Sequence, residues 1–161
     1  MQKITPFLWF DGQAEEAAEL YTSVFANSKI NDVTRYGEGA PVPAGTAMTV
    51  AFELDGTNFI ALNGGPAPFT FTEATSFYVN CETQDEVDYL WGRLTEDGGE
   101  PGNCGWLKDK FGVSWQIAPS ELQTLLTDPD PERAGRAMQA MLGMSKIDIQ
   151  AMRDAADGKP A

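Results

Sequence analysis

The sequence contains no histidine among its 161 residues. Histidine is the commonest general base near neutral pH and the commonest protein ligand for transition metals. Any chemistry in this protein must therefore use carboxylates, amides, tyrosine, cysteine or lysine.

Basic side chains are also scarce. The 11 lysines and arginines stand against 24 aspartates and glutamates, which gives a formal net charge of −13. A surface of this charge repels phosphate backbones and anionic lipid headgroups. We therefore expect neither nucleic acid nor a membrane as a partner.

Long apolar runs and export signals are missing as well. No stretch approaches the roughly 18 apolar residues of a membrane span, and no cationic segment precedes an apolar core near the N-terminus. The two cysteines, Cys81 and Cys104, form no CxxC motif. Reduced thiols and a cytoplasmic location are therefore expected.

The order strand, helix, three strands occurs twice. In the first copy the apolar run 4–10 (ITPFLWF) predicts a strand, and Asp11 is a candidate N-cap for an amphipathic helix that reaches Phe25. Segments 29–36, 46–54 and 57–63 predict three strands, the last two joined by an Asp-Gly turn.

The second copy begins with a strand at 75–81. Thr83 and Glu86 form a capping box before a helix with a buried stripe of Val87, Leu90, Trp91 and Leu94. A short strand at 100–103 leads to a β-hairpin in the stretch 104–119, CGWLKDKFGVSWQIAP, with a connecting turn at 109–112. Lys108, Asp109 and Lys110 are expected to face solvent.

Capping signals at Ser120, Asp130 and Ser145 predict three further helices. Their apolar positions form two stripes, which can be either core or partner surface because methionine adapts to both: Met138, Met141 and Leu142, then Ile147, Ala151 and Met152. We expect an α+β fold of two βαβββ modules, about 4–64 and 74–118, in one domain (1–119) followed by a helical extension (120–161).

Alternation along the last strand places Ser114, Gln116 and Ala118 on the face away from Val113, Trp115 and Ile117. Gln116 thus either lines a pocket or faces water. The same rhythm directs aromatic and polar residues of the first and fifth strands to the Gln116 side, which is typical of a small-molecule site, although the rings could also simply fill a narrow barrel. The candidate ligand-binding residues at this point are Phe7, Trp9, Ser76, Tyr78, Cys104, Trp106 and Gln116. Without histidine to activate it, Cys104 is interpreted as an ordinary thiol rather than a nucleophile.

Two βαβββ units in series resemble the vicinal oxygen chelate superfamily of glyoxalase, bleomycin-resistance and dihydroxybiphenyl dioxygenase proteins. Three stretches resemble its PhnB-like family, which carries the label 3-demethylubiquinone-9 3-methyltransferase: ITPFLWFDGQAEEAAELYTSVF, FIALNGGPAPFTFTEATSFYVNCET and CGWLKDKFGVSWQIAP. The resemblance implies a homodimer in which paired modules form a U-shaped, partly open barrel around each pocket.

The resemblance also implies where a metal would bind. The superfamily positions align near Thr5, Asn63, Ala74 and Gln116, a set without charge, imidazole or thiolate. We therefore expect no metal. The resemblance adds Asn63 to the candidate ligand-binding residues, because Asn63 and Gln116 could orient a polar ligand by hydrogen bonds. A nucleotide-type cofactor is not expected either, because no glycine-rich loop follows a strand in a doubly wound pattern.

Two functions remain open. The first is metal-independent binding of a small planar or aromatic molecule. The second is an enzyme, either a group transferase as the family label suggests or a metal-dependent lyase or dioxygenase. Loss of the metal ligands favours the first, and the residues do not identify the ligand.

Overall fold

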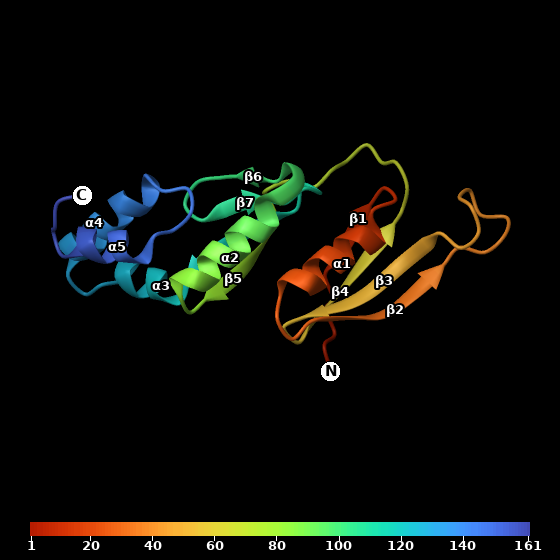
Figure 1. Cartoon of the computed structure of the whole chain (residues 1–161), viewed down its shortest axis with the longest axis horizontal. Coiled ribbons are helices and arrows are strands. Elements are labelled where there is room, and N and C mark those ends of the chain that lie inside the picture. The colour runs from red at the N-terminus through yellow and green to blue at the C-terminus, as the bar shows by residue number, and fades with distance from the viewer. The chain divides into compact units, whose positions relative to one another are not determined.

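The strand, helix, three-strand order is present in the first of two units into which the chain divides, Met1–Thr70 and Phe71–Ala161 (Figure 1). The computed structural model describes residues 1–161. The first unit forms a four-stranded sheet of order β1-β4-β3-β2, in which only β1 and β4 are parallel. Its elements are β1 (Phe7–Phe10), α1 (Ala14–Val24), β2 (Lys29–Arg35), β3 (Ala47–Leu54) and β4 (Thr57–Asn63).

Helix α1 lies along one face of this sheet (Figure 1). Its inward positions are mostly alanines, fully buried at 14, 17 and 18, which lets the helix approach the strands closely. Tyr21 reaches Phe52, whose ring stacks on Phe59 at a centroid distance of 5.4 Å. The predicted Asp-Gly turn joins β3 to β4, and both of its residues have positive φ, as a tight hairpin turn requires.

The start of α1 differs from the prediction. Asp11 does not cap the helix, and Gln13 at the N-cap position makes no capping hydrogen bond with its side chain. Instead, the Asn63 Oδ1 atom at the end of β4 accepts a hydrogen bond from the Ala14 N–H at 2.9 Å. A strand thus satisfies an N–H group that helix geometry leaves without a partner.

The second unit repeats the topology with a sheet of order β5-β8-β7-β6. Strands β5 and β8 are parallel, and the other pairs are antiparallel. Its module consists of β5 (Ser76–Cys81), α2 (Gln84–Thr95), the 3₁₀ turn η1 (Glu96–Gly98), β6 (Glu100–Pro101), β7 (Trp106–Lys108) and β8 (Ser114–Pro119).

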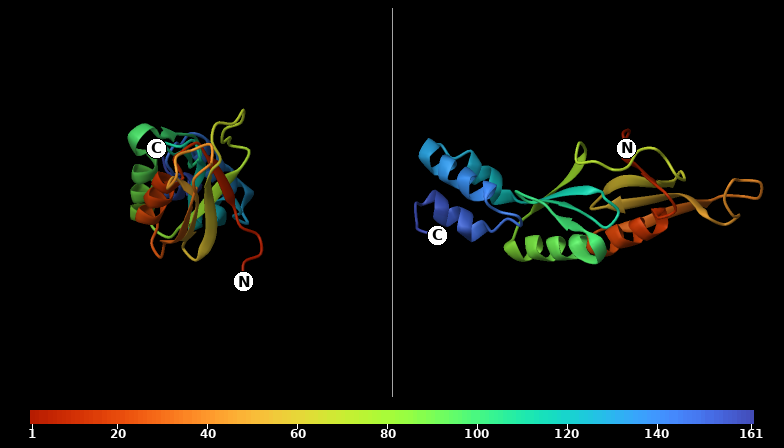
Figure 2. Two further views of the ribbon diagram at one scale, coloured as in Figure 1. Left: turned by 90° about the vertical axis from the view of Figure 1, so that its right-hand side faces the viewer. Right: turned by 90° about the horizontal axis from the view of Figure 1, so that it is seen from above.

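Helix α2 covers one face of the second sheet (Figure 2). Val87, Leu90 and Leu94 are buried as predicted, whereas Trp91 is only half-buried. The Thr83 hydroxyl accepts from the Glu86 N–H, and the Glu86 carboxylate accepts from the Glu82 N–H, one residue before the position expected of a capping box.

Three helices follow β8 and belong to the second unit: α3 (Ser120–Leu126), α4 (Pro131–Leu142) and α5 (Ile149–Ala156) (Figure 2). Asp130 and Asp148 cap α4 and α5, whereas the predicted caps Ser120 and Ser145 do not act as caps. Ile147 and Met152 are fully buried in a cluster with α3 and α4. On α4, by contrast, Met138 and Leu142 are exposed.

The α+β class and the two βαβββ modules are therefore confirmed. Each sheet is open, with two edge strands, and neither closes into a barrel by itself. No helix has the length and apolar character needed to span a lipid bilayer.

Replacing Asn63 with alanine should destabilise the first unit. The side chain also donates to the Ala47 carbonyl at 3.0 Å, so the change leaves a buried N–H and a buried C=O without partners. The expected loss is about 1–3 kcal/mol per unsatisfied group, measured as the free energy of unfolding in urea. Asn58→Ala, at an exposed position of the same strand, is the control. Equal stability of the two variants would contradict this role for Asn63.

Candidate ligand site

The turn between β7 and β8 is built on a buried carboxylate. Asp109 is only 2% exposed, so the expectation of a solvent-facing turn is wrong at this residue. Its Oδ1 atom accepts from the N–H groups of Phe111 and Val113, and its Oδ2 atom accepts from the Trp115 indole at 2.8 Å. These three hydrogen bonds compensate for the water that the Asp109 carboxylate loses on burial, which would otherwise be costly. This cluster fixes the hairpin that carries the site.

The two faces of the second sheet differ sharply. Trp115, Ile117 and Leu107 are buried on the face that α2 covers. The opposite face, which we call the open face, has no helix of its own module over it (Figure 2). Strand alternation therefore separates a core face from a face available for binding.

Register aligns the side chains of the open face in two adjacent rows. Gln116 lies opposite Tyr78 on one side and Trp106 on the other. One pair further along, Ser114 lies opposite Ser76 and Lys108. Directly opposed residues of neighbouring strands point to the same face. An amide flanked by two aromatic rings thus lies beside a polar row with one cation.

Two polar contacts link these rows to their surroundings. The Gln116 Nε2 atom donates to the Ser76 hydroxyl at 3.0 Å. Lys108 Nζ lies 3.3 Å from the Glu73 carboxylate, which comes from the connector before β5. A hydrogen bond from its own backbone N–H, and then Lys108, hold the pKa of Glu73 below its usual value.

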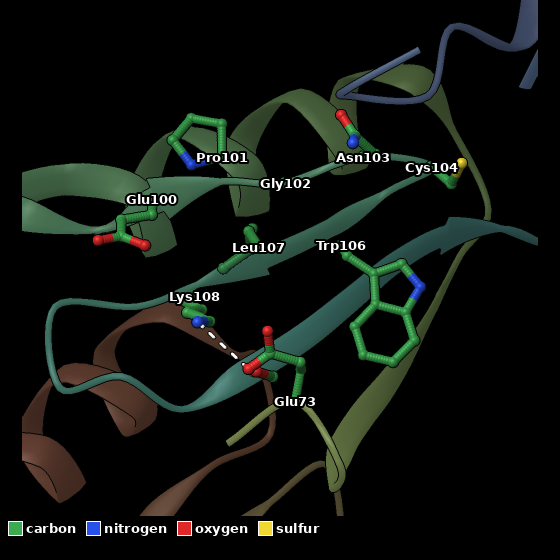
Figure 3. A pocket seen from close by; sticks show the side chains of 10 residues that line it. Glu73, Glu100, Pro101, Gly102, Asn103, Cys104, Trp106, Leu107 and Lys108 are labelled. Atoms are coloured by element: carbon green, nitrogen blue, oxygen red, sulfur yellow. Dashed lines mark ion pairs between the residues drawn. The ribbon is translucent and has the colours of Figure 1, made fainter. Parts of the chain in front are cut away.

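A hollow of about 460 Å³ opens beside the polar row (Figure 3). Its volume falls within the roughly 300–1,000 Å³ of small-molecule pockets. Figure 3 shows the Trp106 ring and the Lys108–Glu73 ion pair facing it. It is lined by Glu73, Glu100, Pro101, Gly102, Asn103, Cys104, Trp106, Leu107, Lys108 and Ser114.

One hydroxyl in this lining has no partner. Ser114 is 2% exposed, and its Oγ atom is buried without a hydrogen bond. Buried hydroxyl groups almost always find a partner, because leaving one unsatisfied costs about 1–3 kcal/mol. The unsatisfied Ser114 hydroxyl is therefore a feature that stability alone does not explain.

The C-terminal segment holds the rim of the hollow in place. The N–H groups of Cys104 and Gly105 donate to the carbonyls of Met144 and Ser145, both at 2.8 Å. Cys104 has a φ of 57°, which is uncommon outside glycine, and these hydrogen bonds support it. The Ser145 hydroxyl donates to the Gly102 carbonyl on the same rim.

The two thiols differ in environment. Cys104 is half-buried at the hollow, whereas Cys81 is fully buried, and neither forms a disulfide. Burial, and then the Glu86 charge, raises the pKa of Cys81 to about 12. Only Cys104 is therefore expected to react with thiol reagents near neutral pH.

In the first unit, Phe7 and Trp9 lie on the sheet face away from α1 and are 56% and 39% exposed. The Trp9 indole donates to the Gly65 carbonyl at 2.9 Å and meets Phe69 edge-on. Its ring lies so close over Gly64 that any Cβ there would come within 2.3 Å of it. Trp9 is thus fixed in place while part of its ring stays accessible.

Asn63 does not share that face. It pairs with Phe10 on the helix side, is 6% exposed, and both ends of its amide are bound to backbone groups. The expectation that Asn63 orients a ligand is therefore wrong, because the side chain is used in capping α1.

The superfamily metal positions do not fit a metal here. Asn63 is engaged, Ala74 has no ligand atom, and Gln116 is hydrogen-bonded to Ser76. No cluster of three carboxylates or thiols suited to a metal ion is found elsewhere in the chain.

Of the eight predicted residues, Cys104 and Trp106 line the hollow, and Ser76, Tyr78 and Gln116 lie on the same open face. Sequence reasoning missed Glu73, Lys108 and Ser114. Alternation does place Ser114 on the Gln116 face, but it gives no sign of an unsatisfied hydroxyl. The Lys108–Glu73 contact spans 35 positions and has no local signal.

A family model described as 3-demethylubiquinone-9 3-methyltransferase matches residues 2–118. The match ends within β8, so α3, α4 and α5 lie outside it. No curated protein matches the sequence.

Several solved structures are similar to this chain. A PhnB protein from Bacillus cereus, provisionally described as a 3-demethylubiquinone-9 3-methyltransferase, is 42% identical with a TM-score of 0.68, covering 74% of this chain and 100% of that one. Protein PA1353 from Pseudomonas aeruginosa is 22% identical with a TM-score of 0.59, covering 74% and 98%. A glyoxylase/bleomycin resistance protein/dioxygenase domain from Frankia is 14% identical with a TM-score of 0.44, covering 71% and 94%.

Replacing Asp109 with asparagine should destabilise the hairpin. The amide NH₂ would face the Trp115 indole N–H, so two donors meet where a donor and an acceptor now pair. We expect a loss of about 1–3 kcal/mol in the free energy of unfolding, whereas Asp11→Asn at an exposed position should change it by less than about 0.5 kcal/mol.

A double-mutant cycle identifies the cause of that loss. Trp115→Phe removes the indole donor, so Asp109→Asn should cost less in this background than in the native protein. Equal costs in both backgrounds would show that the indole contact is not responsible.

Proposed function

The chain belongs to the 3-demethylubiquinone-9 3-methyltransferase family of the vicinal oxygen chelate superfamily, and we propose that it binds a small planar molecule without a metal. The binding site is the open face of the second sheet together with the hollow beside β7. Gln116 contacts the polar edge of the ligand, and Tyr78 and Trp106 contact its flat faces.

The row Tyr78–Gln116–Trp106 carries this proposal. Tyr78 lies beside Gln116 in the register and is 55% exposed. Aromatic side chains in contact with a ligand ring contribute about 0.5–1.5 kcal/mol beyond the buried area. The Gln116 carbonyl oxygen can accept a hydrogen bond while its NH₂ group donates to Ser76.

The family name suggests group transfer as the alternative. A methyl transfer needs a donor cofactor, and no glycine-rich loop of the usual nucleotide-binding type is present in the sequence. Chemical conversion of a bound compound during titration would favour the enzymatic alternative.

Ligand binding is testable by thermal shift with a panel of 2-naphthol, indole and quinoline. A binder at ten times its Kd adds about 1.4 kcal/mol to stability, so the Tm should rise by roughly 3–6 °C. Tyr78→Ala and Trp106→Ala should each weaken binding by about two- to tenfold. Tyr89→Ala, on the exposed side of α2, is the control. Equal binding by all these variants would contradict the proposed site.

Two readouts accompany this titration. Bound ligand should slow the reaction of Cys104 with a thiol reagent, because Cys104 lines the hollow and Cys81 stays protonated. Dialysis against EDTA should leave the Kd unchanged. A Kd that rises after metal removal and recovers with one divalent ion would overturn metal-independent binding.

Homodimerisation and a cytoplasmic location complete the proposal. The first unit exposes Phe7 and Trp9 on the face that α1 does not cover, and an apolar face of this kind favours a partner. Met152 cannot take part as the sequence suggested, because it is fully buried within the C-terminal helices. Leu142, 56% exposed on α4, remains available.

Phe7→Glu should weaken the dimer at least about tenfold, because a carboxylate would replace a buried ring at the contact. Leu142→Glu tests the contribution of the C-terminal helices in the same way. Light scattering at micromolar concentration measures the mass. A monomeric native protein would exclude the dimer, and an unaltered Leu142→Glu dimer would exclude only the helices.

A further inference from the structure

The hollow has one cation in its lining, and a carboxylate from outside the sheet holds it. Lys108 is on β7, whereas Glu73 is in the connector before β5 (Figure 3). The two side chains are 38% and 65% exposed. Solvent-exposed ion pairs contribute little to stability. The Glu73 carboxylate can therefore leave Lys108 without unfolding the site.

Hydrogen-bond donors lie beside this cation. The ammonium group of Lys108 can only donate. The Ser76 hydroxyl accepts from Gln116, which leaves its own proton to donate elsewhere. The Ser114 hydroxyl has no partner and lies between the two in the row. The row thus has unused donors. The acceptor that lies within hydrogen-bonding distance of Lys108 Nζ is the Glu73 carboxylate.

On the basis of the proposed function, we infer that the ligand is a flat aromatic molecule that carries a carboxylate or a similar oxyanion. Its ring lies against Trp106. Its anionic group replaces the Glu73 carboxylate on Lys108 and accepts hydrogen bonds from the Ser114 and Ser76 hydroxyls. Glu73 is an intramolecular stand-in that fills the anion position in the unliganded protein.

The net negative charge of the chain does not prevent an anionic ligand from binding at Lys108. At an ionic strength of about 0.1 M, charges more than about 10 Å away are largely screened. The nearby opposing groups are Glu73, which the ligand displaces, and Glu100, the partner of Lys108 across β6 and β7. Selectivity for an anion therefore depends on the direct contacts with Lys108 and the two hydroxyls.

The test compares three probes of one shape: 2-naphthoate, the neutral 2-naphthamide, and the cationic 2-naphthylmethylamine. Calorimetric titration of the full-length protein at pH 7 should show naphthoate binding about tenfold more tightly than the amide, as expected for charge-assisted hydrogen bonds. The amine should bind more weakly than either. Tighter binding of the amine, or equal binding of all three, would overturn the inference.

Variants of the ion pair should act in opposite directions. Glu73→Gln removes the competitor and should strengthen naphthoate binding by about three- to tenfold, with little effect on the amide. Lys108→Met should abolish the preference for naphthoate. Lys110→Met and Glu38→Gln, charge changes outside the hollow, are the matched controls. Weaker naphthoate binding by Glu73→Gln would contradict the stand-in role.

Ser114→Ala separates a ligand contact from a structural role. Removing an unsatisfied buried hydroxyl should leave the Tm of the unliganded protein unchanged or higher, while naphthoate binding falls by about threefold or more. A lower Tm with unchanged affinity would show that the hydroxyl serves the fold. If none of the three probes binds, both the proposed function and this inference fail; if the amide binds and naphthoate has no advantage, only this inference fails.

Discussion

The buried carboxylate of Asp109 is the constraint on which the geometry of the site depends. Burying a charge is costly unless hydrogen bonds replace the lost water. Here two backbone N–H groups of the turn and the Trp115 indole supply them. The same contacts tie the tight turn to β8 and so fix which residue of β7 lies opposite which residue of β8. If β8 were shifted by one residue against β7, Ser114 and Gln116 would point away from the face that carries Lys108.

The two modules share a topology but stabilise the start of their helices differently. In the first, Asn63 at the end of β4 accepts from the first N–H of α1. The corresponding end of β8 is Pro119, which has no side-chain acceptor, and Thr83 caps α2 locally instead. One consequence is that the first module uses for stability a polar side chain that resemblance alone had assigned to ligand binding. A residue's role thus depends on which backbone groups around it lack partners.

On the open face of the second sheet, by contrast, some polar groups have no structural role of this kind. Ser114 is buried and unsatisfied, and Lys108 is neutralised by a carboxylate from a connector rather than from the sheet. The segment after α4 adds hydrogen bonds to the rim at Cys104 and Gly105, although it lies beyond the part of the chain that the family model matches. The helical extension therefore fixes the backbone around the hollow. Its second stripe, with Ile147 and Met152, is core, whereas Leu142 of the first stripe is exposed.

The sequence by itself determined the α+β class, the repeated module, the strands to within a few residues, and the shared face of Ser76, Tyr78 and Gln116. These features follow from local periodicity and turn chemistry, which act over a few residues. Tertiary structure alone decided that Asp109 is buried, that Asn63 caps α1, and that Glu73 reaches Lys108. The contacts of Asn63 and Glu73 join segments 49 and 35 positions apart, which meet only when the chain folds. The partners of Asp109 lie two to six positions away, but its carboxylate loses contact with solvent only in the packed hairpin. A side chain can bind a ligand only with the donors and acceptors that these contacts leave without a partner. The local sequence pattern does not predict which ones these are.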